Sequence, residues 1–474
     1  MTTHRPTRRA LILGGGLAGT LAAAALAPHC TSVVIIERHA LPEEPEPRRG
    51  LPQARHAHML WSGGADAIEY LLPGTTARWL TAGARRIPLP NGMVSLSPGG
   101  WYRRWSETHY LIGASRDLID WGVRAELQAD PKVSIRVGSE PIRLLGNASR
   151  ITGAVIRNSD DTEETLDTDL VIDAMGRSSR ATRWLGELGV PTVPETTIDA
   201  GVTYASRRYK APAGTETWPV INIQADARLR SPGKVASIIP IERGEWMVSL
   251  SGTRGGEPTS DEALFEDFAS EARSPLVAQY LRHAQPLGLV TVNRNTANRR
   301  RHFEKVRLEG FIAIGDAATA LNPVYGHGMS VAAQSARALR DLAARTGDIA
   351  ARGFARRAQR AIGRPASAAW LLAAGQDIYF PDSLGKTPNL GDRIASAYIH
   401  RLIRTACGDF NVAKALTDVM TLQGGATVLG HPRVLLAAVR GPRLPALNGP
   451  ALTPNEEAVK LGRPRKTASH QAEA

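Results

Sequence analysis

The feature that most constrains this chain is a glycine-rich turn close to its N-terminus. Apolar residues 10–13 precede the turn 14–19, which reads GGGLAG, and an alanine- and leucine-rich stretch continues to about residue 26. A second apolar run, residues 33–36, ends at Glu37. The glycines at 14, 16 and 19 would permit a tight turn, admit a pyrophosphate and pack the helix on the strand. The chain therefore opens as a βαβ unit that binds a dinucleotide.

Glu37 follows the third glycine by 18 residues, at the end of the second predicted strand. A carboxylate at that place accepts hydrogen bonds from ribose hydroxyls and favours a free 2′-hydroxyl over a 2′-phosphate. The glycines at 252, 255 and 256 do not follow a strand with the same spacing. We therefore expect one dinucleotide, and an accidental glycine-rich turn is the weaker interpretation.

Residues 310–329, GFIAIGDAATALNPVYGHGM, form a second informative segment. An apolar run ends in Gly315-Asp316, and Asn322-Pro323 and two further glycines precede an alanine-rich helical pattern. This order suits a strand that ends at a ligand whose phosphates meet a carboxylate and a helix N-terminus. Alone, the segment fits any corner between a strand and a helix. Together with the N-terminal glycine turn, it is interpreted as the second half of the same dinucleotide site.

Composition excludes several other classes of protein. The net charge is +13 and the pI is near 10.1, but the arginines are scattered and no nucleic-acid-binding motif is present, so we expect no nucleic-acid partner. Arg8-Arg9 resembles the start of a twin-arginine export signal. The dinucleotide-binding interpretation also explains the spacing of the glycines, so we favour it over export. Two cysteines and no apolar run of 18 residues favour a cytoplasmic protein without a membrane partner.

The order of predicted elements indicates an α/β (α+β) fold with one Rossmann-type domain. We predict a helix over residues 58–72, a helix capped by Ser115, and strands over 133–137, 151–157, 170–172, 220–223, 234–241 and 246–250. Residues 1–80, 106–200 and 290–352 form the predicted dinucleotide-binding domain. Residues 81–105 and 201–289 form an inserted β-sheet substrate domain. Residues 353–474 form a helical C-terminal region whose tail, after residue 442, is predicted to be loose.

A third motif makes the pattern specific to a family. Residues 173–179, DAMGRSS, follow a predicted strand. With the N-terminal glycines and Gly315-Asp316 in this order, the chain resembles the single-domain flavin monooxygenases related to p-hydroxybenzoate hydroxylase. The strings at 51–58 (LPQARHAH), 169–176 (DLVIDAMG) and 322–329 (NPVYGHGM) resemble flavin-dependent polyene epoxidases of polyether ionophore biosynthesis, of the monensin and lasalocid type. The resemblance covers most of residues 8–335.

The resemblance implies a bound FAD and the residues that hold it. Glu37 and Arg38 would hold the adenosine half, Arg116 the pyrophosphate and Asp316 the ribityl or pyrophosphate region, and residues 323–329 would lie beside the isoalloxazine ring. The complete FAD site implied is Gly14, Gly16, Leu17, Ala18, Gly19, Glu37, Arg38, Arg55, Arg116, Asp173, Gly176, Asp316, Pro323, Gly326, His327, Gly328 and Met329.

The resemblance also implies a reaction. Reduced FAD would react with O2 to give a C4a-hydroperoxide, which passes one oxygen atom to an alkene of a polyene polyketide, free or carrier-bound. The flavin performs this chemistry, so no catalytic side chain is assigned. Related hydroxylases carry Asp-Gly where this chain has Met175-Gly176. Direct use of NAD(P)H and reduction by a separate flavin reductase therefore both stay open as the electron source.

The β-rich insert is the predicted floor of the substrate cavity. The residues proposed to line it are Tyr204, Val220, Ile223, Ile238 and Tyr325. Core packing explains the same apolar residues. An aromatic polyketide hydroxylase and a flavin reductase of the geranylgeranyl-reductase type stay open as alternatives, and a non-enzymatic flavoprotein is disfavoured by the intact 322–329 loop. His56 and His58 lack a third ligand nearby, so we expect no metal.

Overall fold

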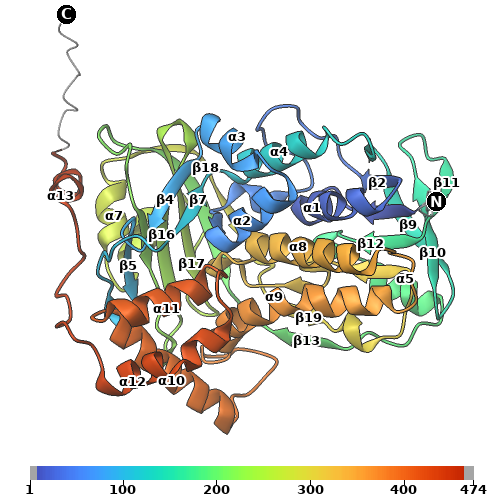
Figure 1. Ribbon diagram of the computed structural model, residues 1–474. Coiled ribbons are helices and arrows are strands. Elements are labelled where there is room, and N and C mark those ends of the chain that lie inside the picture. The colour runs from blue at the N-terminus through green and yellow to red at the C-terminus, as the bar shows by residue number, and fades with distance from the viewer. Residues whose placement is uncertain (1–7, 464–474) are drawn as a thin grey trace, which may run out of the picture.

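The computed structural model describes residues 8–463, and its first layer is a five-stranded parallel sheet on the right of Figure 1. The strand order is β20-β12-β1-β2-β8, and every neighbouring pair is parallel. The strands are β1 Arg9–Leu13, β2 Ser32–Glu37, β8 Val133–Val137, β12 Leu170–Asp173 and β20 Phe311–Ala313. This is the Rossmann-type sheet that the N-terminal glycines predict.

Both faces of this sheet are covered, which explains why its strands are continuous apolar runs. Ala10 and Ile12 of β1 enter the core beneath the helices, whereas Leu11 and Leu13 enter the core on the opposite face. The helices on the first face are α1 Leu17–Leu26, α4 Arg116–Leu127, α8 Gly328–Thr346 and α9 Phe354–Asp377. The opposite face is covered by α5 Ala181–Glu187 and a three-stranded sheet of β9 Glu140–Gly146, β10 Ile151–Arg157 and β11 Glu163–Asp167.

The carboxyl ends of the parallel strands form one edge. Leu13 is in register with Ile36 and with Asp173, and Asp173 is in register with Ala313. The residues that follow these strand ends are therefore neighbours, although β1 ends at Leu13 and β20 at Ala313. Ligands of open α/β sheets bind at such an edge.

A seven-stranded, mostly antiparallel sheet lies on the left of Figure 1, in the order β18-β14-β17-β16-β15-β5-β6. Its strands are β5 Met93–Ser97, β6 Gly100–Trp101, β14 Thr203–Lys210, β15 Val220–Ile223, β16 Lys234–Ile241, β17 Glu245–Gly252 and β18 Gln285–Asn293. Helices α6 Phe265–Ser270 and α7 Leu276–Leu281 pack on it around Trp218 and Trp246. The predicted boundary at residue 290 falls inside β18.

Two small sheets join these layers. One contains β3 Met59–Trp61, β7 His109–Gly113 and β4 Arg85–Leu89, and the other contains β13 Glu195–Ile198, β19 Asn298–Arg301 and β21 Thr319–Ala320. Strand β4 therefore pairs with β7 and not with the seven-stranded sheet, to which the predicted 81–105 segment would have assigned it. Helices α2 Ser62–Leu71 and α3 Thr75–Thr81 follow β3.

The C-terminal region is helical, with α10 Leu390–Ala406, α11 Phe410–Met420, α12 Pro432–Arg440 and α13 Pro454–Lys460 after α9. The prediction of a loose tail after residue 442 is wrong up to residue 463. Thr453 caps α13 in a capping box, Val459 is buried in the core of the seven-stranded sheet, and Glu456 pairs with Arg104 at 2.7 Å. Residues 464–474 lie outside the described residues. Within residues 8–463, no helix combines the length and hydropathy needed to cross a bilayer.

The local predictions are mostly confirmed. Ser115 caps α4, because its Oγ accepts a hydrogen bond from the Leu118 N–H at 3.2 Å. The predicted strands near 133, 151, 170, 220, 234 and 246 all form. The predicted helix over 58–72 is wrong at its start, where Met59–Trp61 pairs with β7 as β3. Backbone pairing with a distant strand outweighs the local helical pattern there.

Candidate functional site

A cavity of about 880 Å³ runs from the carboxyl edge of the parallel sheet to the face of the seven-stranded sheet. It is lined by residues from both layers and from the 322–329 loop. The predicted site residues that line it are Gly14, Gly16, Leu17, Ala18, Glu37, Arg38, Arg116, Gly176, Tyr204, Asp316, Pro323, Gly326, Gly328 and Met329. One cavity therefore brings together fourteen predicted residues from six separate segments of the chain.

The glycine turn at one end of the cavity requires its glycines for steric reasons. Gly14 has a φ of +107°, and a Cβ there would lie 2.7 Å from the carbonyl oxygen of Ala174. A Cβ on Gly19 would lie 1.9 Å from the carbonyl oxygen of Gly14. This contact confirms the predicted role of Gly19, which is to let α1 approach β1. Gly19 does not line the cavity, so its inclusion among the FAD-binding residues is corrected. Gly16 begins α1 without a side-chain cap, which leaves backbone N–H groups for an anion.

Glu37 is buried beside this turn and is held in a fixed position. Its Oε2 accepts a hydrogen bond from the Gly15 N–H at 3.0 Å, and its Oε1 accepts one from the His39 N–H at 2.9 Å. Arg48 lies 3.7 Å from Glu37 and donates from Nη1 to the Gly15 carbonyl at 3.2 Å. The buried Nε of Arg48 has no partner among residues 8–463. Sequence reasoning missed Arg48, which follows a proline-rich loop and belongs to no recognisable motif.

Arg116 enters the cavity from the first turn of α4. The side chain is buried, and its Nε donates to Asp120 Oδ1 at 2.7 Å, one helical turn away. This contact orients a guanidinium at the cavity wall, in a position suited to a phosphate. Burial first, and the nearby Arg116 charge second, lower the pKa of His58 to about 3.

The DAMGRSS turn contributes Gly176 to the cavity, whereas Asp173 lies beneath it. Asp173 is completely buried, and accepts hydrogen bonds from the Met175 N–H at 3.0 Å and the Ser179 hydroxyl at 2.5 Å. Burial raises the pKa of Asp173 from 3.8 to about 6. Its prediction as a cofactor ligand is wrong, because this carboxyl group shapes the turn on which Gly176 adopts a φ of +71°.

Arg177 and Asp316 connect this turn to the one that follows β20. Arg177 Nε lies 3.5 Å from Asp316 Oδ2, and Nη1 donates to the Ala297 carbonyl at 2.7 Å. A second guanidinium nitrogen donates to the carbonyl of Leu321. Arg177 thus ties three loops around the cavity, and sequence reasoning did not include it among the site residues. Its position directly after Gly176 was the available signal.

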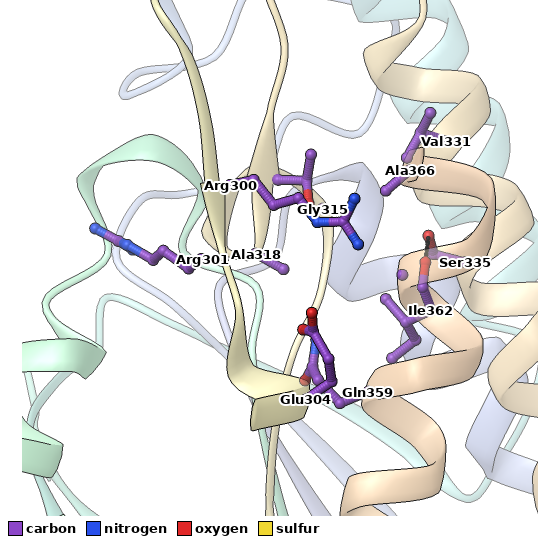
Figure 2. A pocket seen from close by; sticks show the side chains of 12 residues that line it. Arg300, Arg301, Glu304, Gly315, Ala318, Val331, Ser335, Gln359, Ile362 and Ala366 are labelled. Atoms are coloured by element: carbon purple, nitrogen blue, oxygen red, sulfur yellow. Dashed lines mark hydrogen bonds between the residues drawn. The ribbon is translucent and has the colours of Figure 1, made fainter. Parts of the chain in front are cut away.

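The loop after Asp316 is supported from behind by tightly packed side chains (Figure 2). Gln359 of α9 accepts a hydrogen bond from the Ala313 N–H at 2.9 Å and donates one to the Ala313 carbonyl at 3.0 Å. Figure 2 shows Ser335 and Ile362 on the side of the pocket that faces Gly315 and Ala318. The void between these residues has a volume of about 10 Å³. That void holds one water molecule at most. The space for a large ligand is therefore on the other side of the turn.

A buried carboxyl group of α9 fixes the 322–329 loop. Asp377 accepts hydrogen bonds from Asn298 Nδ2 at 2.6 Å, Asn322 Nδ2 at 2.9 Å and the Tyr325 hydroxyl at 2.7 Å. Asn322 Oδ1 in turn accepts a hydrogen bond from the Val324 N–H at 3.2 Å. Burial raises the pKa of Asp377. No sequence motif contains Asp377, because its three partners come from β19 and from the loop, far away in the chain.

Several predicted residues lie elsewhere. Arg55 is exposed at the end of a short turn, and His327 is buried with its Nε2 3.0 Å from the Met420 carbonyl oxygen, where burial lowers its pKa to about 4. Neither lines the cavity. The same correction applies to Tyr325, which faces Asp377, and to three apolar residues that pack inside sheet cores: Val220, Ile223 and Ile238. Apolar strand residues alternate between faces, and single-sequence reasoning did not identify which face bounds the cavity.

The end of the cavity away from the glycine turn is built by His56, Tyr204, Thr291 and Asn293, together with Leu321 and Pro323 of the loop. Tyr204 and His56 meet edge to face, with ring centroids 4.2 Å apart. Burial lowers the pKa of His56 to about 4 and raises that of the Tyr204 hydroxyl above its usual value. Both side chains are therefore uncharged at neutral pH.

Known proteins resemble this chain in sequence and in fold. Residues 7–352 match the family model described as FAD binding domain. The chain is 29% identical over 398 residues to Protein Rv3254 of Mycobacterium tuberculosis, covering 79% of this chain and 81% of that protein. It is 29% identical over 351 residues to kynurenine 3-monooxygenase of Salinispora arenicola, covering 69% and 71%. The solved structure of p-nitrophenol 4-monooxygenase PnpA from Pseudomonas putida superposes with a TM-score of 0.60 at 14% identity, covering 88% and 98%.

Proposed function

Since the chain belongs to the FAD-binding domain family and is an enzyme of the FAD-dependent monooxygenase type, we propose that it epoxidises alkenes of a polyene polyketide during polyether antibiotic biosynthesis. The single observation that carries this proposal is the continuous cavity of about 880 Å³. One end carries the dinucleotide fingerprint and the other end reaches the seven-stranded sheet. A cofactor and an extended substrate can share such a space.

The residues around the cavity fit FAD. The uncapped N-terminus of α1 and the Arg116 guanidinium would hold the pyrophosphate, and Glu37 would accept the adenosine ribose hydroxyls. Asp316 and the loop residues Pro323, Gly326, Gly328 and Met329 would hold the ribityl chain and the ring. Bound FAD, once reduced, supplies the activation of O2 for transfer of one oxygen atom.

The chemistry of the far end favours an alkene over a phenol as the acceptor of that oxygen. Hydroxylation of a phenol benefits from a base beside the substrate hydroxyl, whereas epoxidation of an alkene requires none. Burial lowers the pKa of His56, the histidine at this end, to about 4, so its imidazole is a weak base. The chain's own contribution would be to bind and orient the alkene and to exclude water.

Hydroxylation of an aromatic polyketide is the second candidate function. The names of two similar proteins, kynurenine 3-monooxygenase and p-nitrophenol 4-monooxygenase, favour it, since both act on aromatic rings. The two candidates differ in the substrate that is consumed. A matched pair of probes, a phenol and a linear polyene of similar length, separates them by which probe gains oxygen.

The source of electrons is part of the proposal. Related hydroxylases carry an acidic residue before the glycine, where this chain has Met175. We propose two routes for reduction of the FAD: a separate flavin reductase, or NAD(P)H acting directly. Adding NADPH to the purified protein, with and without a flavin reductase, distinguishes these routes by bleaching of the flavin absorbance. The same preparations, offered the polyene free or attached to a carrier protein, test in which form the substrate arrives.

The test of the proposed function is a product analysis. The yellow protein is incubated with a reductant, O2 and candidate polyenes, and the mass of each product is measured. Epoxidation adds one oxygen atom per alkene converted. A reductase of the geranylgeranyl-reductase type changes the mass by hydrogen alone, and a non-enzymatic flavoprotein gives no product. Either of these two results overturns the proposal.

A further inference from the structure

His56 combines deep burial with an unused hydrogen-bonding atom. The side chain is 3% exposed, it lines the cavity, and its Nδ1 lies 3.0 Å from the Ser206 hydroxyl oxygen. Its Nε2 has no hydrogen-bond partner among residues 8–463. Buried polar atoms are nearly always paired, so an unpaired one beside a cavity indicates a partner that enters with a ligand.

The tautomer of His56 depends on a short chain of hydrogen bonds through two serines. The Ala57 N–H donates to Ser249 Oγ at 3.2 Å, and Ser249 Oγ is hydrogen-bonded to Ser206 Oγ. The hydrogen bond between the two serines can run in either direction. The direction in which Ser249 donates leaves no hydroxyl proton of this chain unpaired, since Ser206 is the acceptor that Ser249 has among the described residues; Ser206 then donates its own proton to His56 Nδ1, and the proton of the neutral imidazole is on Nε2. The Ala57 N–H and the two serines thus favour this tautomer.

The surroundings of His56 place it on the substrate side of the cavity. Ser206 and Tyr204 belong to β14 and Ser249 belongs to β17, both in the seven-stranded sheet. The glycine turn and Glu37 belong to the parallel sheet. A group that approaches Nε2 therefore meets the wall opposite the dinucleotide fingerprint.

From this geometry we infer that His56 is a substrate-recognition residue, whose Nε2–H donates a hydrogen bond to an uncharged oxygen of the substrate, such as a ketone, ester, ether or hydroxyl oxygen. The inference rests on the proposed function for the unsaturated, mainly apolar character of that substrate. It adds that a plain hydrocarbon polyene is a poor ligand, because binding it leaves a buried N–H without an acceptor.

The first test reads the tautomer directly. Nitrogen-15 labelling of histidine gives separate chemical shifts for protonated and unprotonated ring nitrogens, and a His56→Gln variant assigns the His56 signals. We expect protonated Nε2 and unprotonated Nδ1 in the wild-type protein. Protonated Nδ1 would overturn the inference. This readout needs neither substrate nor turnover, so it is independent of the proposed function.

The second test measures binding of two probes to the oxidised, FAD-loaded protein. One probe is a linear conjugated ketone, and the other carries a methylene group in place of the carbonyl. Quenching of flavin fluorescence gives the dissociation constants. We expect the wild-type protein to prefer the ketone by about tenfold. We expect His56→Leu to lose this preference, because the ketone loses its donor and the hydrocarbon no longer leaves an N–H unpaired and therefore binds more tightly. We expect His56→Gln, whose amide donates, to retain most of the preference.

The control variant is His302→Leu, because His302 pairs with Thr196 and Glu304 away from the cavity. It should leave the affinities for both probes unchanged. If His56→Leu keeps the preference for the ketone, or if the wild-type protein shows none, the Nε2–H only packs against Tyr204 and the inference falls. Epoxidation of an alkene would be unaffected by that result. Conversely, a protein that prefers the ketone but transfers no oxygen supports His56 recognition and contradicts the proposed function.

Discussion

The two ends of the cavity are built in different ways. At the adenosine end, the glycine turn and Glu37 lie close together in the sequence, and their geometry is set by backbone contacts such as the 1.9 Å approach that a Cβ on Gly19 would make. At the substrate end, the residues come from distant segments. His56 is hydrogen-bonded to Ser206 and meets the Tyr204 ring edge to face, and Asp377 holds the loop through side-chain hydrogen bonds.

The adenosine end meets a requirement that is the same in every FAD-binding protein, whereas the substrate end meets one that differs from substrate to substrate. Every FAD presents the same pyrophosphate and ribose, so a short backbone motif is sufficient to bind it. Substrates differ, and side chains on a sheet face can change without disturbing the turn. The adenosine end should therefore respond to substitution by losing cofactor and fold together, whereas the substrate end should lose selectivity or loop order while FAD binding is partly retained.

The largest effect is expected for Gly19→Ala, which tests whether backbone contact governs the adenosine end. The added Cβ collides with the Gly14 carbonyl, so we expect the free energy of unfolding to fall by roughly 4 kcal/mol and FAD affinity to fall by roughly 100-fold. Thermal unfolding and FAD titration measure the two quantities. The control is Gly186→Ala, where no atom lies within 4 Å of the new Cβ. Equal behaviour of the two variants would contradict a steric role.

Asp173→Asn tests how the buried turn between the two ends of the cavity makes the free energy of unfolding depend on pH. The folded-state pKa of Asp173 is raised to about 6 from 3.8, so the folded protein binds this proton more tightly than the unfolded chain. The Asp173 contribution to stability therefore falls as pH rises from about 4 to about 6, by roughly 3 kcal/mol, and is constant above that. Relative to wild type, the variant should gain stability over this range. If the difference in stability between the variant and wild type does not change with pH, the raised pKa of Asp173 is disproved.

Asp377→Ala tests the side-chain network at the substrate end. Three buried donors lose their acceptor, so we expect roughly 2 kcal/mol of destabilisation. FAD affinity should fall by about tenfold, because the loop beside the proposed ring position loosens. Asp199→Ala, which removes a half-exposed carboxylate 3.3 Å from Arg254, should cost less than about 1 kcal/mol. If Asp377→Ala binds FAD as tightly as wild type, the 322–329 loop takes no part in binding the cofactor.

The smallest effect is expected for Glu37→Gln, which keeps the shape of the side chain and removes its charge. A glutamine offers one carbonyl oxygen, so one of the Gly15 and His39 N–H groups loses its acceptor and faces the amide NH2 group. FAD affinity should fall by about fivefold to tenfold, and the free energy of unfolding by about 1 kcal/mol. Glu164→Gln, an exposed partner of Arg136, is the control and should bind FAD normally. A variant that binds FAD as tightly as wild type would remove Glu37 from the adenosine site.

The same contrast explains what the sequence could predict. The βαβ opening and the Ser115 cap were predictable, because glycine spacing, strand ends and caps are local signals. Cavity residues such as Arg116 and Met329 were expected only through the resemblance to flavin monooxygenases. Arg48, Arg177 and Asp377 were not identified as site residues, since their roles depend on contacts that the fold creates. Val220, Ile223 and Ile238 were misplaced because an apolar strand residue fits a core and a cavity equally well.

The central claim is that this cavity brings FAD, dioxygen and an alkene together for transfer of one oxygen atom. The most direct test supplies the FAD-loaded protein with a reductant, an oxygenated polyene and isotopically labelled dioxygen in ordinary water. The account predicts an epoxide that carries one labelled oxygen atom for each alkene converted. A product that gains only hydrogen, or whose oxygen comes from water, would contradict it.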